Sequence, residues 1–443
     1  MKIQLSDHFS YGRLLRFVFP SIVMMIFTSI YGVVDGLFVS NFVGKTPFAA
    51  VNLIWPVLMA LGALGFMVGT GGSAIIAKTL GEGDRQKANQ VFSMLVTVTV
   101  IGGLFFTVVG MIWLRPIAQM LGAEGAMLED CVTYGRIILA VESTFMLQNV
   151  FQSVLVTAEK PQLGLAFTVA AGMTNIVLDA LFVAVFRWGL VGAAVATAAS
   201  QLVGGLAPLL YFARENDSLL RLTSFRMDWR ALGKTCTNGS SELMTNLSMS
   251  LVNILYNFQL MRMIGEDGVA AYGVIMYVNF IFVAIFLGYA IGSAPIVGYH
   301  YGAENHSELK NLLGKSLVLM GGGGIVLAAL AEALSLPLAT IFVGYDQGLM
   351  ELTCRGFRIY ALSFLITGFN IFGSAFFTAL NNGLVSALIS FLRTLLFQIA
   401  AVLLLPLVWG VDGIWAAIVV AELLAFGVTA VFLLKMKNRY HYG

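Results

Sequence analysis

Apolar segments of about 20 residues recur along the whole chain, and that is the length at which an α-helix crosses a lipid bilayer. The first of them carries no charged residue from Phe17 to Val34. Of the 443 residues, 59% are hydrophobic and only 11% are charged, against roughly 25% charged residues in soluble domains. A soluble core cannot absorb that much apolar surface, so the sequence predicts an all-α integral membrane protein. The formal net charge of +2 gives no support for a nucleic-acid partner.

The pattern predicts twelve transmembrane helices. The first begins after Arg13 and Arg16, and no small-residue cleavage site follows it, so we expect a retained helix rather than a signal peptide. The twelve expected helices cover residues 14–43, 47–77, 88–114, 130–157, 162–186, 188–212, 235–262, 268–299, 308–334, 352–379, 383–406 and 410–435.

Lysine and arginine are distributed unevenly between the loops. If both termini lie in the cytoplasm, the inside segments hold 17 of the 25 Lys and Arg residues and the outside segments hold 7, while Arg393 lies within a helix. The cytoplasmic loops of membrane proteins carry the excess of positive charge. The reverse orientation would invert that ratio, so we expect both termini in the cytoplasm.

The chain also contains an internal repeat. When the sequence is shifted against itself by 221 residues without gaps, Trp188 falls on Trp409, and "NVFQSVLVTA" (149–158) falls on "NIFGSAFFTA" (370–379). Each copy holds six helices, so both copies enter the membrane from the same side and a pseudo-two-fold axis runs along the membrane normal. Substrate sites in such folds lie near the middle, between the repeats. The expected organisation is an N-terminal six-helix lobe, a cytoplasmic linker and a C-terminal six-helix lobe, at residues 1–212, 213–234 and 235–443.

Four polar side chains stand inside apolar segments of the first copy. Asp35 would cost roughly 2.5–3.5 kcal/mol at the centre of a spanning helix. Asn175 and Asp179 are four residues apart and therefore share one helix face. Counted from the outer helix ends at 1.5 Å per residue, Asp35, Asp179 and Thr197 lie ~14, ~12 and ~14 Å deep. Three helices thus place oxygen atoms in one layer. The alternatives are a hydrated Asp35 at an early helix end, a structural hydrogen-bonding role for Asp179, and a Thr197 hydroxyl bonded to its own backbone.

The second copy lacks these polar groups. At the positions equivalent to Asp35, Asn175, Asp179 and Thr197 it has Tyr256, Leu396, Ala400 and Ile418. The fold therefore does not require acids there, which argues against a purely structural role. The second lobe instead presents Tyr256, Asn253, Asn257 and Asn370.

Other charged residues are expected to be structural or interfacial. Arg393 and Glu422 lie deep in adjacent helices at similar heights, which favours a structural ion pair. Glu142, Glu242 and Glu332 lie near the expected helix ends, so we expect these carboxylates at the membrane interface.

Several motifs together resemble the multidrug and toxic compound extrusion (MATE) family over essentially the whole chain. They are "VDGLFVSNFVG" in the first helix, "NIVLD" in the fifth, "WGLVGAAVATAASQ" opening the sixth and a repeated "GEGD…N" loop. Major facilitator transporters, which also pair six-helix lobes, usually carry a Gly-Asp-Arg-rich signature that "AKTLGEGDRQKANQ" does not match. Within the MATE family the chain is most similar to the bacterial MepA-like branch.

The resemblance implies a secondary antiporter, not an enzyme, that exports organic cations by alternating access in exchange for inward Na⁺ or H⁺. It places the chain in a bacterial cytoplasmic (inner) membrane, requires no cofactor, and assigns Asp35, Asn175, Asp179 and Thr197 to a cation site in the N-terminal lobe. Two carboxylates in a low-dielectric layer cannot easily both stay charged, so they would share a proton or recruit Na⁺. The sequence does not choose between these ions.

The expected partners are the lipid bilayer and small cationic or amphiphilic substrates, and we expect a monomer. The expected lining of the substrate cavity is Tyr256, Asn253, Asn257, Asn370, Asn149 and Gln152. The main alternative is a flippase or exporter of lipid-linked or amphiphilic anions. Such flippases tend to carry several Arg or Lys residues in the central cavity, whereas only Arg393 is deep here. A channel is a third possibility, and single-channel currents would reveal it.

Overall fold

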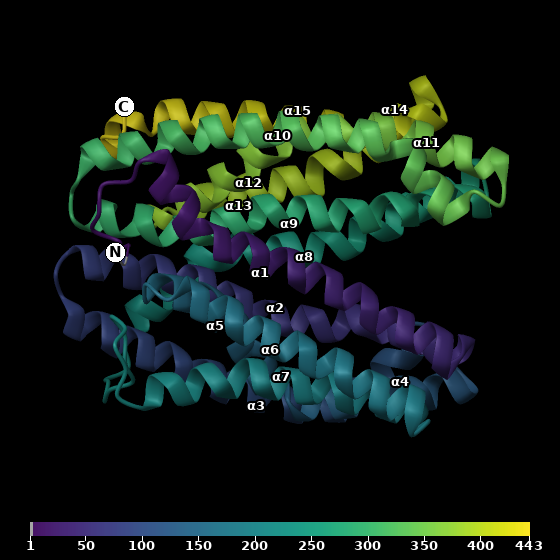
Figure 1. The fold of residues 1–443 in the computed structure, drawn as a ribbon, viewed down its shortest axis with the longest axis horizontal. Coiled ribbons are helices and arrows are strands. Elements are labelled where there is room, and N and C mark those ends of the chain that lie inside the picture. Colours follow the sequence, from purple (N-terminus) through teal and green to yellow (C-terminus); the bar gives the residue numbers. More distant parts are fainter. Residues whose placement is uncertain (1–2) are drawn as a thin grey trace.

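The computed structural model describes residues 3–443, so Lys2, counted above among the cytoplasmic lysines, lies outside the described residues. Every regular element within that range is a helix, and the helices form two lobes (Figure 1). The N-terminal lobe consists of α1 (Tyr11–Phe38), η1 (Val39–Val43), α2 (Lys45–Gly81), α3 (Arg85–Met120), α4 (Gly125–Ala140), α5 (Glu142–Thr157), α6 (Pro161–Asp179), η2 (Ala180–Val185) and α7 (Gly189–Ala213). The C-terminal lobe consists of α8 (Trp229–Met263), α9 (Glu266–Gly302), α10 (His306–Val343), α11 (Gln347–Ala361), α12 (Phe364–Ala379), α13 (Gly383–Phe391), η3 (Leu392–Leu396), α14 (Phe397–Trp409), α15 (Val411–Lys435) and the short α16 (Lys437–Tyr440).

All twelve expected spans coincide with helices, but two of them are broken. Residues 130–157 form the pair α4 and α5, which are bent by 59°, and residues 352–379 form α11 and α12, which are bent by 47°. The breaks fall at Val141 and Leu362, which are equivalent positions of the 221-residue repeat. Neither break contains proline or glycine, so the sequence pattern gave no signal for it.

The helix α8 differs from the other spans in polarity. Within residues 3–443, nine helices are individually long and apolar enough to cross a membrane, and the two bent pairs bring the number to eleven. The twelfth, α8, is 35 residues long but carries many Ser, Thr and Asn side chains. Several of its residues, among them Thr245 and Asn253, line an internal cavity rather than the lipid-facing surface. Its polarity is therefore explained by the interior that it faces.

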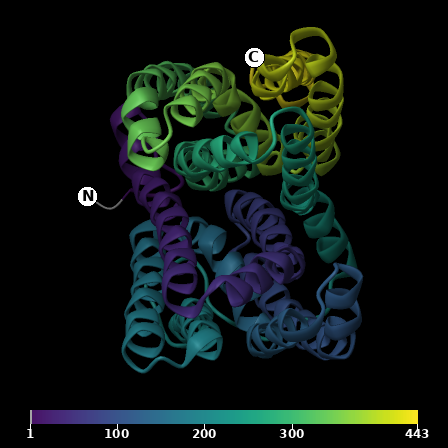
Figure 2. The ribbon, with the colours of Figure 1, turned by 90° about the vertical axis from the view of Figure 1, so that its right-hand side faces the viewer.

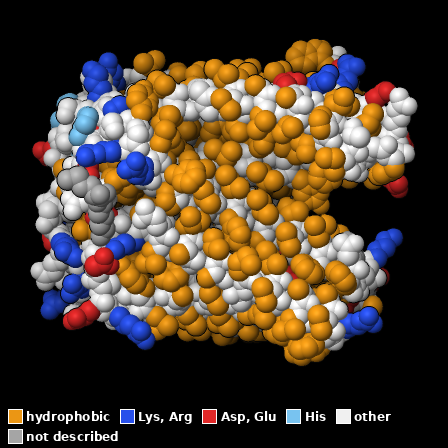
Figure 3. Space-filling view, viewed as in Figure 1, with side chains coloured by type: hydrophobic (Ala, Val, Ile, Leu, Met, Phe, Trp, Pro, Cys, Tyr) orange, Lys and Arg blue, Asp and Glu red, His pale blue; other side chains and the backbone are white. Residues whose placement is uncertain are grey.

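The two lobes meet at one end of the molecule and separate at the other. Both termini lie at the closed end (Figure 1), where α2 packs against α8 and α9, and α1 packs against α9. A cleft hollows the opposite end, and apolar side chains cover the middle of the visible face, with charged residues gathered at both ends (Figure 3). Seen from the open end, α1 passes along one side from the C-terminal to the N-terminal lobe (Figure 2). The two lobes therefore enclose a central cleft that is open at one end of the molecule.

The linker between the lobes is docked on the N-terminal lobe. Arg85 of α3 donates to the carbonyl oxygens of Leu219 and Ser218, at 2.9 Å in each case. The Leu220 side chain is completely buried. Lys160 Nζ lies 2.5 Å from Asp217 Oδ2 in the same segment. The linker is thus part of the N-terminal lobe surface rather than an independent tether.

Candidate functional site

Three of the four polar residues expected in the N-terminal lobe meet around one point. Asn175 Nδ2 lies 3.5 Å from Asp35 Oδ1 and 3.4 Å from Thr197 Oγ1. Thr197 Oγ1 lies 3.4 Å from Asp35 Oδ1, which closes the triangle. Hydrogen bonds of this kind usually measure 2.7–3.2 Å, so these three contacts are long. The polar groups converge without satisfying one another fully.

Asp179 lies directly behind this triangle. Its side chain is 0% exposed, and no N–H or hydroxyl group between residues 3 and 443 donates to either carboxyl oxygen. Its carboxyl group interacts electrostatically with that of Asp35. Two buried carboxyl groups that interact in this way cannot easily both stay charged, so the arrangement favours a bound proton or another positive charge.

The local helix geometry positions these side chains. The π-helix η2 begins at Ala180, immediately after Asp179, and η1 begins at Val39, one turn beyond Asp35. π-Helical turns widen a helix locally and are frequent at functional sites. Sequence periodicity cannot reveal such turns, because one inserted residue leaves the apolar pattern almost unchanged.

The triangle opens into a cavity of about 280 Å³ in the N-terminal lobe. Asp35, Asn175 and Thr197 line it, as do the expected residues Asn149 and Gln152. Tyr31, Trp55, Phe66 and Phe145 supply aromatic walls, and Asn149 donates to the carbonyl oxygen of Gly62 at 3.1 Å. The site thus combines a carboxylate with aromatic faces, which attract cations.

The sequence analysis did not single out Tyr134, which belongs to the same site. Its ring is 1% exposed, and it lines the cavity together with Thr197. It lies in α4, one residue before Gly135, a glycine that the repeat matches to Gly356. The repeated glycine was the only feature of the sequence that could have drawn attention to this position, and it indicates a constraint on the backbone at Gly135 rather than a role for the Tyr134 side chain.

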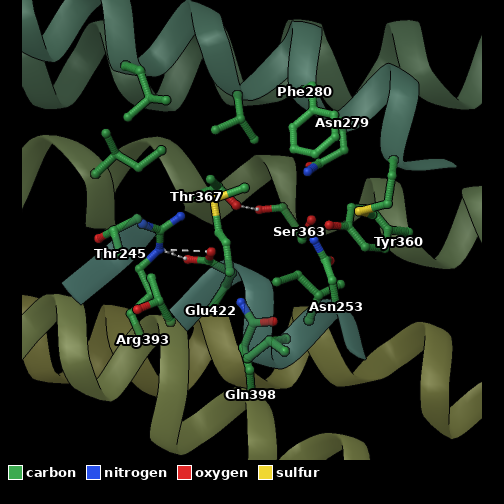
Figure 4. A pocket seen from close by; sticks show the side chains of 18 of the residues that line it. Thr245, Asn253, Asn279, Phe280, Tyr360, Ser363, Thr367, Arg393, Gln398 and Glu422 are labelled. Carbon is green, nitrogen blue, oxygen red and sulfur yellow. Dashed lines mark hydrogen bonds and ion pairs between the residues drawn. The ribbon is translucent and has the colours of Figure 1, made fainter. Parts of the chain in front are cut away.

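The C-terminal lobe contains a second cavity, of about 190 Å³ (Figure 4). Tyr256 and Asn253 line it as expected, and Tyr256 stacks on Tyr272 with ring centroids 4.9 Å apart. Tyr272 in turn donates its hydroxyl group to Asn253 Oδ1 at 2.8 Å. One wall of the cavity is therefore an ordered aromatic surface.

Two of the expected cavity residues lie elsewhere. Asn370 is 0% exposed, and its amide donates to Glu422 Oε2 at 2.6 Å and to the Glu422 carbonyl oxygen at 2.9 Å. Both of these hydrogen bonds go to Glu422, so the Asn370 side chain lies behind the cavity rather than in it. Asn257 is half-buried on α8, one turn beyond Asn253, and does not line this cavity. Neither Asn370 nor Asn257 is among the residues that line this cavity, and their assignment to the substrate space stays a prediction.

Arg393 and Glu422 meet at the edge of the same cavity (Figure 4). Arg393 Nε lies 2.9 Å from Glu422 Oε1 and 3.1 Å from Glu422 Oε2. The side chains are 13% and 2% exposed, respectively. Arg393 is carried by the π-helix η3.

Glu142 is not at the membrane interface as expected. It begins α5 at the bend after α4, its side chain is 0% exposed, and neither carboxyl oxygen has a hydrogen-bond partner among the described residues. The expectation was wrong because Glu142 is the thirteenth residue of the expected span 130–157, near its middle rather than at an end.

The helix α1 lines both cavities. Met25 and Ser29 face the C-terminal cavity, whereas Tyr31, Gly32 and Asp35 face the N-terminal one. A change in the shape of α1 would therefore alter both cavities at once.

Comparison with known proteins adds to this geometry. The MatE family model matches residues 20–181 and 243–403, one match in each lobe. The multidrug export protein MepA of Staphylococcus aureus (strain MRSA252) is 21% identical over 413 residues, which cover 93% of this chain and 91% of that protein. The MepA protein of Staphylococcus haemolyticus (strain JCSC1435) is 23% identical over 372 residues, covering 81% of this chain and 80% of that protein.

Solved structures match the fold over its full length. A structure described as the outward-facing conformation of a multidrug resistance MATE family transporter of the MOP superfamily has a TM-score of 0.93 at 23% sequence identity. The match covers 100% of this chain and 99% of that chain. The resemblance inferred from the motifs, including that to the MepA-like branch, and the two-lobed all-α fold are thereby confirmed.

Proposed function

We propose, from the premise that this chain belongs to the MatE family of multidrug transporters, that it exports organic cations in exchange for an inward-moving Na⁺ or H⁺. The observation that carries the proposal is the convergence of Asp35, Asn175 and Thr197 on one point of the N-terminal cavity, with Asp179 behind them. We assign the coupling ion to these four residues.

The geometry suits either ion. A proton can bridge the carboxyl groups of Asp35 and Asp179. For a metal cation, the 3.4 Å between Thr197 Oγ1 and Asp35 Oδ1 is close to the ~3.4 Å between two oxygen ligands at right angles around an ion with bonds of ~2.4 Å, as hard cations have. The Asn175 amide would turn over to present Oδ1, which has no hydrogen-bond partner among residues 3–443. Both ions neutralise the same pair of acids.

The driving force is sufficient for concentrative export. Each positive charge that moves inward gains ~2.3 kcal/mol per 100 mV of membrane potential. A tenfold concentration ratio of substrate across the membrane costs ~1.4 kcal/mol, so the energy of one charge at 100 mV sustains a ratio of about fiftyfold. Ion release to the inside would reshape the N-terminal lobe and admit a cationic drug, and ion binding from outside would eject it.

The proposed orientation follows the distribution of Lys and Arg. With both termini in the cytoplasm, the cleft described above opens to the outside of a bacterial cytoplasmic membrane. Alternating access then requires the lobes, residues 1–212 and 235–443, to rock as nearly rigid units in a monomer, with the linker carried by the first.

A flippase for anionic amphiphiles is the second candidate, because Arg393 lines the C-terminal cavity. Its charge, however, is neutralised by Glu422 at 2.9 Å, so the cavity offers no excess of positive charge. Organic cations therefore remain the better-supported cargo.

Transport by the purified protein in proteoliposomes tests the proposal, with Na⁺ and H⁺ gradients imposed separately. Asp35→Asn and Asp179→Asn should each reach wild-type membrane levels yet lose gradient-driven efflux of a cationic dye. Tyr256→Phe, at the position equivalent to Asp35, should retain ion coupling. Asp267→Asn, an exposed acid outside both cavities, is the matched control. Undiminished efflux by both Asp35→Asn and Asp179→Asn would refute the mechanism.

A further inference from the structure

Three cations from different elements gather at the closed end of the molecule, on the seam between the lobes. Lys78 stands in the last turn of α2, Lys234 in the second turn of α8 and Arg439 in α16. The helix α2 belongs to the N-terminal lobe, whereas α8 and α16 belong to the C-terminal lobe. Partial burial lowers the pKa of Lys234, and the positive charges of Lys78 and Arg439 lower it further. The three charges are therefore close enough to repel one another.

Two tyrosine rings hold Lys78 and Arg439 in this arrangement. Lys78 Nζ lies 5.6 Å from the ring centroid of Tyr301, and Arg439 Cζ lies 5.5 Å from that of Tyr440. Cations at such distances are attracted by the ring face. The two rings contact each other edge to face, with their centroids 5.6 Å apart. Lys78 thus reaches across the seam and rests on an aromatic pair of the C-terminal lobe.

The cluster carries more positive charge than the protein neutralises. Glu82 Oε1 lies 3.4 Å from Lys78 Nζ, and the two side chains are 42% and 38% exposed, respectively. An ion pair this exposed is weak, so it leaves Lys78 open to a second anion. Lys234 and Arg439 form no ion pair or side-chain hydrogen bond with residues 3–443. Three cations against one carboxylate leave two positive charges for an anion from outside the protein.

The cluster lies beside exposed apolar side chains. A Cβ atom on Gly383, the first residue of α13, would collide with the carbonyl oxygen of Thr237, which is one turn after Lys234. The next residue of α13, Leu384, is 74% exposed, and so is Leu434, at the end of α15 just before α16. Cations at the end of apolar helices attract anionic lipids. A phospholipid would satisfy both features, with its headgroup on the cations and its acyl chains along the leucines.

We infer that the headgroup phosphate of an anionic phospholipid binds between Lys78, Lys234 and Arg439. Ammonium and guanidinium groups form strong charge-assisted hydrogen bonds with phosphate oxygens. A phosphate held here contacts both lobes at the closed end, and opening of that end would carry Lys78 away from Tyr301 and Arg439. The lipid therefore stabilises the conformation in which this end is closed and the cleft is open. This role does not depend on the identity of the coupling ion or of the exported molecule.

Native mass spectrometry of the purified full-length protein in detergent tests the binding. The wild-type protein should retain dioleoylphosphatidylglycerol about tenfold more strongly than dioleoylphosphatidylcholine, because each cation adds to the affinity for an anionic lipid. The triple variant Lys78→Gln, Lys234→Gln, Arg439→Gln should lose this preference. The charge-retaining variant Lys78→Arg, Lys234→Arg, Arg439→Lys should keep it. The preference should also persist in a control that neutralises three exposed cations elsewhere, Lys87→Gln, Arg214→Gln and Arg221→Gln.

Two further measurements identify the source of the phosphate and its effect. Excess inorganic phosphate should not displace the lipid, because it lacks acyl chains. Spin labels at Phe42 and Met263, at the open end, should show longer distances in phosphatidylglycerol nanodiscs than in phosphatidylcholine nanodiscs, and the triple glutamine variant should show no such difference.

The inference is overturned by any of several results. These are equal retention of both lipids by the wild-type protein, an unchanged preference in the triple glutamine variant, an equal loss of preference in the control, a loss in the charge-retaining variant, displacement by inorganic phosphate, or distances that do not respond to the lipid. None of these measurements involves transport, so the proposed function stands or falls separately.

Discussion

Gly81 and Gly302 contact the opposite lobe in reciprocal fashion. A Cβ atom on Gly81 would collide with the carbonyl oxygen of Tyr299, and one on Gly302 would collide with that of Lys78. All four residues are related by the 221-residue repeat, since 81 matches 302 and 78 matches 299. The contact therefore lies around the pseudo-two-fold axis, at the closed end. These glycines allow α2 and α9 to approach closely enough to seal that end.

Gly81→Ala and Gly302→Ala should accordingly destabilise the conformation described here. The added methyl groups would push the closed ends of α2 and α9 apart, and the lobes would rock toward closure of the cleft. Spin labels at Phe42 and Met263, near the outer ends of α1 and α8, should then show a shorter mean distance by double electron–electron resonance. Gly314→Ala, in α10 with open space around its position, is the control. An unchanged distance distribution in both variants would show that these contacts do not hold the state.

The buried pair of Arg393 and Glu422 should matter for folding. Removing one partner leaves an uncompensated buried charge, which typically costs ~3–5 kcal/mol. Arg393→Ala or Glu422→Ala alone should therefore lower the yield of monodisperse protein. Arg393→Met with Glu422→Leu should recover it. If size-exclusion chromatography shows the double variant to be as poor as the worse single one, the two residues are not stabilised as a pair.

The docked linker should respond to acid. The hydrogen bond from Lys160 lowers the pKa of Asp217 from its usual value. Because the pKa is lower in the folded state, the stabilisation is present above the unfolded pKa of ~3.9 and is lost as the pH falls through the folded value. Asp217→Asn should therefore lower the amide protection factors of residues 214–228 at neutral pH, and acid should lower them in the wild-type protein once the slower intrinsic exchange is corrected for. Glu215→Gln, its exposed neighbour, should not. Equal exchange in all three proteins would contradict this contribution.

The hydroxyl groups around Asp35 should tune ion affinity. Thr197 Oγ1 lies 3.4 Å from Asp35 Oδ1, and Tyr134 lines the same cavity. Thr197→Val removes an oxygen from the site, so a larger Na⁺ or H⁺ gradient should be needed for half-maximal efflux. Tyr134→Phe should have the same effect more weakly, since its hydroxyl group lines the cavity without contacting Asp35. A loss of maximal efflux without any shift in ion dependence would point to a role in folding instead.

The positions of the helices and the grouping of the acids followed from the sequence because both depend on patterns along the chain. Apolar length indicated every span except the more polar α8, and depth along three helices placed Asp35, Asp179 and Thr197 in one layer. The bends at Val141 and Leu362 were missed because neither break carries proline or glycine.

The direction in which a side chain points was harder to predict than the depth of its residue in the membrane. Asn370 has the depth of a cavity residue, yet it points to Glu422 behind the cavity. Tyr134 has no unusual spacing, and only packing brings it to the cavity that Thr197 lines. Which way a side chain points depends on helix rotation, and in an apolar helix with little amphipathic contrast the sequence hardly constrains that rotation.

The polarity of α8 has a consequence for how the protein is made. A helix leaving the ribosome partitions into the bilayer according to its own apolarity, and polar residues near its centre oppose that step. By this measure α8 would not insert alone, whereas α9, which follows it directly, is among the nine strongly apolar helices of the described chain. We expect the two to enter the membrane together as a hairpin, with α8 held at the insertion machinery until α9 has been synthesised. The polar residues of α8 that line the interior thus make membrane insertion of α8 depend on α9.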